Sequence, residues 1–183
     1  MSEQALIDYC APTLAGLKTA NLFVCDYDDR ATLMDEIRAY NERLRKKGLA
    51  MVPVRIRDGR AHIYIYRPAK LACDLGCAHA EKILAHYGYD ATKPGQCVAR
   101  LSQRLADYDT FPHEIGLFLG YPPEDVEGFI RNKGCGGKCI GCWKVYGDAE
   151  NAQKCFDRFK KCTRIYKDMH QKGKTIDQLA VRV

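Results

Sequence analysis

Apolar and polar positions in the first third of the chain follow two different periods. Runs of strand length occupy 19–25, 49–56 and 61–67, and the last run alternates apolar and polar side chains as a half-buried strand does. An Asp-Gly pair at 58–59 has the composition of a tight turn between the second and third runs. The pattern predicts three strands, the last two joined as a hairpin.

A helical period separates the first strand from the second. Over 30–47 the apolar residues recur three and four positions apart, and Gly48 stands where a left-handed residue ends a helix. With a short helix from Ser2 to Cys10 ahead of it, the segment 1–67 is predicted to form a β-α-β-β unit whose first two strands run parallel.

The second half of the chain is mostly helical in its pattern. The predicted elements are a helix over 68–87 divided at Gly76, a helix over 92–106, two short helices flanking Gly-Tyr-Pro-Pro at 120–123, a short strand at 143–147 and a final helix over 149–172. We therefore expect an α/β (mixed α+β) fold with a small mixed sheet of about four strands. The segment 68–183 is the mainly helical part of a single domain that spans 1–183.

The final predicted helix carries cysteines on its apolar stripe. The stripe residues are Ala152, Cys155, Phe159, Cys162, Tyr166 and Met169. Cys155 and Cys162 are interpreted as small buried hydrophobic residues. The basic residues of the segment 161–174 are interpreted as a solvated helix face rather than a membrane anchor.

Ten cysteines are many for a chain of 183 residues with 46% apolar and 28% charged residues. The N-terminal segment is acidic and lacks the basic start of a signal peptide, and no apolar run approaches the roughly 20 residues that span a bilayer. We expect a cytoplasmic protein with no membrane partner, in which the cysteines are thiols, metal ligands or reactive groups rather than disulfides. A net charge of +6 with dispersed basic residues does not indicate a nucleic-acid partner.

Three cysteines, Cys135, Cys139 and Cys142, lie close together in a glycine-rich segment. Their Cys-x3-Cys-x2-Cys spacing is that of three thiolates on an iron–sulfur cluster, and the glycines allow a loop to wrap closely. Zinc is the alternative cofactor if a fourth ligand completes a tetrahedral site. Thiol redox chemistry without a metal and a loop of passive thiols stay open beside these metal hypotheses.

A different chemistry is suggested by Cys10 and Lys18. A thiol beside a helix end and a cation has a lowered pKa and gains nucleophilicity. His113 and Glu114 can supply a base and its orienting partner if the fold brings them to this thiol. The structural alternatives are a packed, inert Cys10 and a His113 that hydrogen-bonds locally at a helix terminus.

The segment 112–132 has the rhythm of a helix-turn-helix. Its second helix would present Glu124, Asp125 and Glu127 to phosphates, and this repulsion argues against DNA binding. We prefer a helical hairpin that shapes a small-molecule pocket, because its glycines permit close helix approach.

Several segments together resemble one protein family. They are CAPTLAGLKTANLF at 10–23, IYIYRPAKL at 63–71, FPHEIGLFLGYPPEDVEGFI at 111–130, WKVYGD at 143–148 and KCTRIY at 161–166. In this order they resemble the domain of unknown function 3793 family of anaerobic bacteria, over nearly the whole chain. The resemblance implies that one fold, shared with this family, extends over nearly the whole chain, and it implies no particular activity. Similar proteins often read GYWKVYGD where this chain reads GCWKVYGD, so the resemblance does not extend to Cys142.

These features favour a cysteine-rich redox or metal-binding protein of anaerobic metabolism that acts on a small molecule or a redox partner protein. One form of this function is an enzyme with a pocket beside the hairpin FPHEIGLFLGYPP at 111–123. The alternative is a non-enzymatic ligand or metal sensor, or an adaptor, that acts through protein contact.

Overall fold

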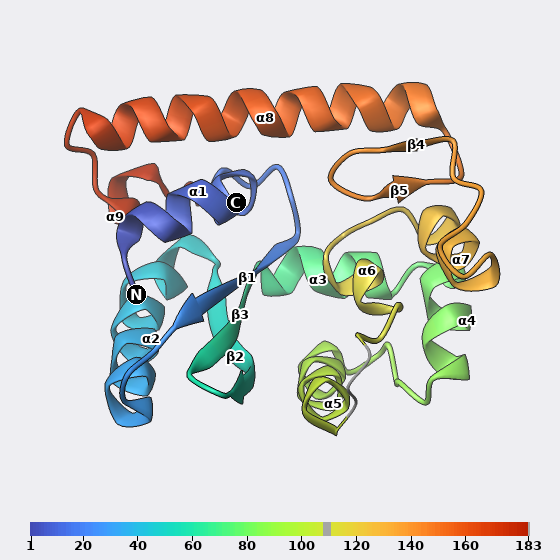
Figure 1. Ribbon diagram of the computed structural model, residues 1–183, viewed down its shortest axis with the longest axis horizontal. Coiled ribbons are helices and arrows are strands. Elements are labelled where there is room, and N and C mark those ends of the chain that lie inside the picture. Colours follow the sequence, from blue (N-terminus) through green and yellow to red (C-terminus); the bar gives the residue numbers. More distant parts are fainter. Residues whose placement is uncertain (108–110, 183) are drawn as a thin grey trace.

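Three strands form the central sheet of the structure, a computed structural model that describes residues 1–107 and 111–182 (Figure 1). The strands β1 (Ala20–Asp26), β2 (Ala50–Arg57) and β3 (Arg60–Tyr66) lie in the order β1-β3-β2. Both outer strands pair antiparallel with β3. The edge strand β2 accommodates Pro53 and a register shift after it, because one side of an edge strand has no partner.

The two faces of this sheet carry separate hydrophobic cores. In β3, Ile63 and Ile65 belong to the first core, whereas Tyr64 and Tyr66 belong to or pack on the second, as the period of two requires. Helices α1 (Glu3–Leu14) and α2 (Arg30–Leu44) cover the first face. The helices on the second face are α3 (Pro68–Leu75), α4 (Ala78–His86), α5 (Pro94–Asp107), α6 (Ile115–Phe118) and α7 (Pro123–Arg131).

Local sequence explains where several helices begin and end. The Asp29 carboxylate accepts a hydrogen bond from the backbone N–H of Thr32 at 2.7 Å and caps α2. The 3-10 turn η1 (Arg45–Lys47) then leads to Gly48, whose φ of 73° is left-handed. Gly76 separates α3 from α4, and the Cys77 sulfur caps α4.

The long helix α8 (Ala149–Gln171) runs over both α1 and a two-stranded ribbon of β4 (Cys139–Ile140) and β5 (Lys144–Val145) (Figure 1). Its first half packs on the ribbon through Phe156 and Val145. Its second half joins the first core through Cys162 and Tyr166. One helix therefore connects the N-terminal unit with the cysteine-containing ribbon.

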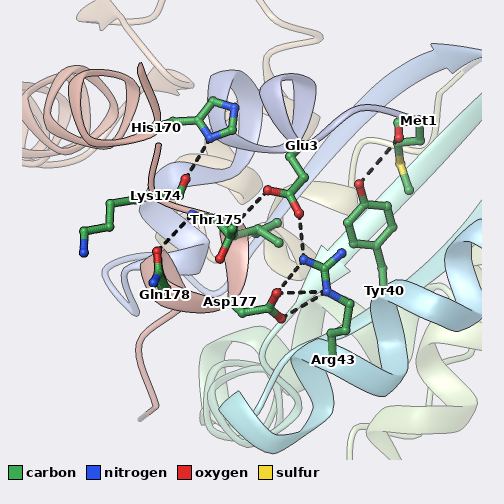
Figure 2. Close-up of polar contacts among 10 residues, drawn as sticks. Met1, Glu3, Tyr40, Arg43, His170, Lys174, Thr175, Asp177 and Gln178 are labelled. Carbon is green, nitrogen blue, oxygen red and sulfur yellow. Dashed lines mark hydrogen bonds and ion pairs between the residues drawn. The ribbon is translucent and has the colours of Figure 1, made fainter. Parts of the chain in front are cut away.

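Arg43 binds the C-terminal region of the chain to its N-terminal region (Figure 2). Its guanidinium donates to Asp177 at 2.5 Å and to Glu3 at 2.6 Å. The second oxygen of Glu3 accepts from the backbone N–H of Ile176 at 3.0 Å, where α9 (Ile176–Leu179) begins. Because only a short turn separates α8 from α9, this network holds the end of α8 against α1 and α2.

Arg67 joins three distant backbone segments from inside the fold. Its side chain is 2% exposed and donates to the carbonyl oxygens of Thr13, Leu14, Lys47 and Val181. Desolvation lowers the pKa of this guanidinium from its usual value. The four carbonyls replace the hydration that burial removes, so the end of α1 is tied to the C-terminal segment.

The predicted mixed α/β class with a mostly helical second half is confirmed. The sheet differs from the prediction in its pairing. β1 and β2 do run in the same direction, but β3 lies between them, so the described three-stranded sheet is antiparallel rather than mixed. The strand predicted at 143–147 is β5, and it pairs with β4 in a separate ribbon.

The stripe of α8 also differs in detail from the prediction. Phe156 is buried, whereas Cys155 is half-buried and Met169 is 38% exposed. The predicted stripe alternates spacings of three and four residues and so repeats about every 3.5 residues. A straight α-helix repeats about every 3.6 residues, and over the length of α8 this difference moves the buried face away from the predicted stripe at both ends. In the described residues no helix is both long and apolar enough to cross a membrane.

Candidate functional site

Lys18 is a buried cation in the turn after α1. Its backbone N–H donates to the carbonyl of Pro12 at 3.1 Å, which folds the turn back on the helix end. The residue is only 7% exposed. Its ammonium forms no hydrogen bond or ion pair with any residue that the structure describes, and lies 5.2 Å from the ring centroid of Tyr121. The charge therefore faces an aromatic ring and has no anionic partner in the part of the chain that the structure describes.

Burial lowers the pKa of Lys18 to about 8. The thiols of Cys142, Cys10 and Cys155 lie close enough to act on this amine, and each opposes the shift when it is ionised. Desolvation outweighs them, and it also raises the pKa of Cys10 and of Cys142, so these thiols stay neutral near pH 7. Because a neutral thiol carries no charge, Cys10 and Cys142 do not compensate the positive charge of Lys18.

An open cavity of about 670 Å³ lies against Lys18 between α1 and α8. Asp168 is the one carboxylate among its described lining residues. The aromatic residues that line it are Tyr9, Tyr121, Phe156 and Phe159, and the cationic residues are Lys18, Lys160, Arg164 and Lys167. The cavity combines apolar walls with an excess of positive charge.

The cations of α8 reach the cavity because of helical spacing. Lys160, Arg164 and Lys167 follow at intervals of four and three residues, which places them on one helix face. Lys167 is partly compensated by Asp8 at 3.0 Å. Lys160 and Arg164 are exposed and form no ion pair within residues 1–107 and 111–182. They form a cationic rim, while Lys18 forms the inner wall.

A smaller cavity of about 280 Å³ also borders Lys18. Cys155 lines this smaller cavity and Cys142 lines the larger one, whereas Lys18 lines both. Lys18 therefore borders two accessible spaces. The other charged residues around the smaller cavity are Lys70, Asp74, Glu124, Asp125, Asp148 and Arg158, and none of them is bonded to Lys18.

The hairpin of α6 and α7 borders a separate apolar cavity of about 240 Å³. His113 packs edge-on against Phe129, with 5.1 Å between ring centroids, and Trp143 closes another side. Gly116 is required here, since a Cβ at this position would lie 2.7 Å from a methyl group of Val126. Close approach of the two hairpin helices, expected from the sequence, is present.

Asp125 connects this hairpin to the ribbon. It is 3% exposed, and its carboxylate accepts hydrogen bonds from the Trp143 indole and from the backbone N–H groups of Tyr146 and Gly147, each at 2.7 Å. The sequence-based placement of Asp125 on an exposed helix face is therefore wrong, because three donors from the ribbon outcompete water for this carboxylate. Glu124 and Glu127 are exposed, as expected.

The three clustered cysteines occupy three different environments. Cys135 is exposed, Cys139 packs beside Val145, and Cys142 lines the cavity next to Lys18. Among the described residues no group of three or more His, Cys, Asp or Glu side chains is placed to hold a metal ion. A metal bound by these three thiols would need the loop to rearrange, and it stays a prediction.

The glycine-rich loop is held by hydrogen bonds and packing instead. The Lys144 ammonium donates to the Gly134 carbonyl at 2.5 Å, and the Tyr146 hydroxyl donates to the Cys135 carbonyl at 2.9 Å. A Cβ at Gly141 would lie 2.2 Å from the Phe156 ring. This glycine lets the loop backbone rest directly on α8, which brings Cys142 to the Lys18 cavity.

The structure brings together only part of the predicted catalytic set. Cys10 and Lys18 are close enough to interact electrostatically, but Cys10 is fully buried in the first core. Glu114 is 1% exposed and is bound by Arg104 at 2.7 Å and by the Tyr89 hydroxyl at 3.1 Å. It cannot orient a base for Cys10, because its carboxylate is engaged in the second core.

Sequence reasoning missed the cavity's cationic rim. The basic residues at 161–174 were expected to form a solvated face, yet Arg164 and Lys167 line the cavity together with Lys160. The available signal was the spacing of these cations on the same helix that carries Phe156 and Phe159. Tyr121, which contacts Lys18, gave no signal because the two residues are distant along the chain.

Comparisons with known proteins add a family and no activity. A family model described as "Protein of unknown function (DUF3793)" matches residues 6–180. Neither the curated proteins nor the solved structures include a match.

Proposed function

This chain belongs to the protein family of unknown function DUF3793, and we propose that it binds a small organic anion in the cavity between α1 and α8. One observation carries the proposal: Lys18 is only 7% exposed, it lines the cavity, and its ammonium has no anionic partner in the described residues. A bound carboxylate or phosphate would supply that partner.

The distribution of charge supports an anionic ligand. Lys160 and Arg164 stand at the cavity without ion-pair partners in the described chain, and Asp168 alone opposes them among the lining carboxylates. Cations gathered around a concave surface raise the local concentration of anions. The guanidinium of Arg164 is also suited to bidentate contact with a carboxylate or phosphate.

The shape and lining of the cavity support a ligand with an aromatic or otherwise planar body. Tyr121, Phe156 and Tyr9 present ring surfaces to the same space as the cations. A volume of about 670 Å³ lies within the usual range for small-molecule sites. An inorganic ion alone would leave these rings without a contact, so the proposed ligand is organic.

The energetic cost of Lys18 favours a functional role over a structural one. A buried ammonium without a partner destabilises the fold, and such groups cluster at binding and catalytic sites. Methionine has nearly the same length and would fill the position without this cost. The presence of a lysine at this position is explained if its charge or its amine acts on a ligand.

Calorimetric titration with phenyl phosphate tests the proposal, with phenol as the neutral control. We expect phenyl phosphate to bind and phenol not to bind. Lys18→Met should weaken phosphate binding by about tenfold or more. Lys160→Met should weaken it by roughly two- to fivefold.

Lys161→Met is the matched control, because Lys161 is the next residue on α8 and does not line the cavity. Its affinity should equal that of the unmodified protein. Equal losses in Lys160→Met and Lys161→Met would point to general charge attraction and would contradict a site in this cavity.

A further inference from the structure

We propose that Lys18 is a nucleophilic amine that forms a Schiff base with a carbonyl group of the bound anion, so that the ligand is an anionic aldehyde or ketone. This inference rests on the anion-binding function proposed above. It gives the amine of Lys18 a covalent role in addition to its attraction for the anion, and Lys160 and Arg164, which line the same cavity, share the contact with the anionic group.

The position of Lys18 meets the requirements of an amine nucleophile. More than nine-tenths of the residue is buried, and its Nζ atom makes no hydrogen bond or ion pair in the described chain that would hold a proton on it. It nevertheless lines two cavities, so a ligand in either space can reach it. The Tyr121 ring and the thiols of Cys10, Cys142 and Cys155 lie near the amine, and the charged residues of the smaller cavity are not bonded to it.

Desolvation supplies the neutral amine that the reaction needs. With a pKa of about 8, roughly a tenth of Lys18 is unprotonated at pH 7. An exposed lysine with its ordinary pKa has about 300-fold less neutral amine at this pH. The environment of Lys18 therefore favours this lysine over those on the surface.

The proposed step is balanced without an oxidant or a reductant. The Nζ lone pair attacks the carbonyl carbon and gives a carbinolamine. The carbon–oxygen bond then breaks and the C=N bond forms. The carbonyl oxygen leaves as water with the two hydrogens of the amine, so the products are one imine and one water molecule.

The geometry of α8 sets the approximate size of the ligand. Phe159 lines both cavities together with Lys18, and Lys160 and Arg164 follow Phe159 by one and five residues on α8. At a rise of 1.5 Å per residue, Lys160 and Arg164 lie about 1.5 and about 7.5 Å farther along the helix axis than Phe159. A carbonyl group at Lys18 and an anionic group near Lys160 would be joined by a short body, which the ring of Tyr121 or Phe156 can cover.

Reductive trapping with pyridoxal 5′-phosphate tests this inference, because this probe is an anionic aromatic aldehyde of suitable size. The full chain is incubated with the probe near pH 7, reduced with sodium borohydride, digested, and the modified fraction of every lysine is measured by mass spectrometry. We expect Lys18 to be modified at least about tenfold faster than Lys161. Pyridoxal without the phosphate should react more slowly at Lys18.

Lys18→Arg serves as the matched variant, since it keeps the cation and cannot form an imine. It should retain phenyl phosphate binding and lose the dominant adduct. Modification of Lys18 at the same rate as Lys161, with phenyl phosphate still bound, would overturn the Schiff base and leave the anion site intact. Absence of phenyl phosphate binding in the unmodified protein would overturn the proposed function itself.

Discussion

Replacing Lys18 with methionine should stabilise the protein at neutral pH. The substitution removes the ammonium and keeps a flexible apolar stem of similar length next to Tyr121. Folding lowers the pKa of Lys18 from 10.5 to about 8. Because each pKa unit corresponds to about 1.4 kcal/mol, burial of the protonated amine costs about 3 kcal/mol at pH 7.

The sign of the pH dependence follows from the proton count. Below pH 8 both the folded and the unfolded protein carry the proton on Lys18, and the full cost is present. Between pH 8 and pH 10.5 the unfolded chain binds more protons at this site, so the stability contributed by Lys18 rises with pH. The advantage of Lys18→Met should therefore fall to roughly half its value by about pH 9.5.

Urea denaturation under reducing conditions, followed by circular dichroism at pH 7 and at about pH 9.5, measures the difference in unfolding free energy between Lys18→Met and the unmodified protein. Cysteines ionise in the unfolded chain near the upper pH, but this effect is common to both proteins and cancels in the comparison. Lys160→Met is the control, since Lys160 is exposed and should show neither the gain nor its pH dependence. If Lys18→Met is less stable than the unmodified protein at pH 7, the inference that an uncompensated Lys18 ammonium destabilises the fold is refuted.

Three further outcomes test other parts of the structure. Asp125→Ala should lower the free energy of unfolding by about 2–4 kcal/mol in urea denaturation, because three donors lose their acceptor; an effect no larger than that of Glu124→Ala would be inconsistent with this. Arg67→Met should lower the free energy of unfolding by about 3–5 kcal/mol in the same assay, since four carbonyl oxygens lose a buried donor. A loss below about 1 kcal/mol would contradict the role of Arg67 in joining these backbone segments. If the clustered cysteines bind one metal centre, anaerobically purified protein should contain metal that Cys139→Ser lacks, and equal, negligible metal in both would end that hypothesis.

Local elements of the fold were predictable because short stretches of sequence determine them. The period over 30–47 predicted α2, and Gly48 ends it with the expected left-handed φ. The division at Gly76 and the hairpin around Gly120 were also predicted correctly. In each case the controlling interactions are hydrogen bonds and side-chain contacts between residues only a few positions apart.

Strand pairing could not be obtained in the same way. The same three strands can be arranged with β1 beside β2 or with β3 between them, and both arrangements keep every strand's apolar pattern. The hairpin of β2 and β3 leaves β3 free on its other side, where β1 pairs through seven residues. The choice depends on contacts that are distant along the chain, which local periodicity does not encode.

The candidate site shows the same division most clearly. The family, the mixed α/β class and the cysteines, lysine and glycine-rich loop of the segments that build the site could all be recognised from the sequence. Three features depend on how the chain folds: Glu114 pairs with Arg104, Asp125 is buried against the ribbon, and Lys18 has no anionic partner among the described residues. The chemistry of a polar side chain depends on its desolvation and on its partners, and both are set by residues that meet only when the chain folds.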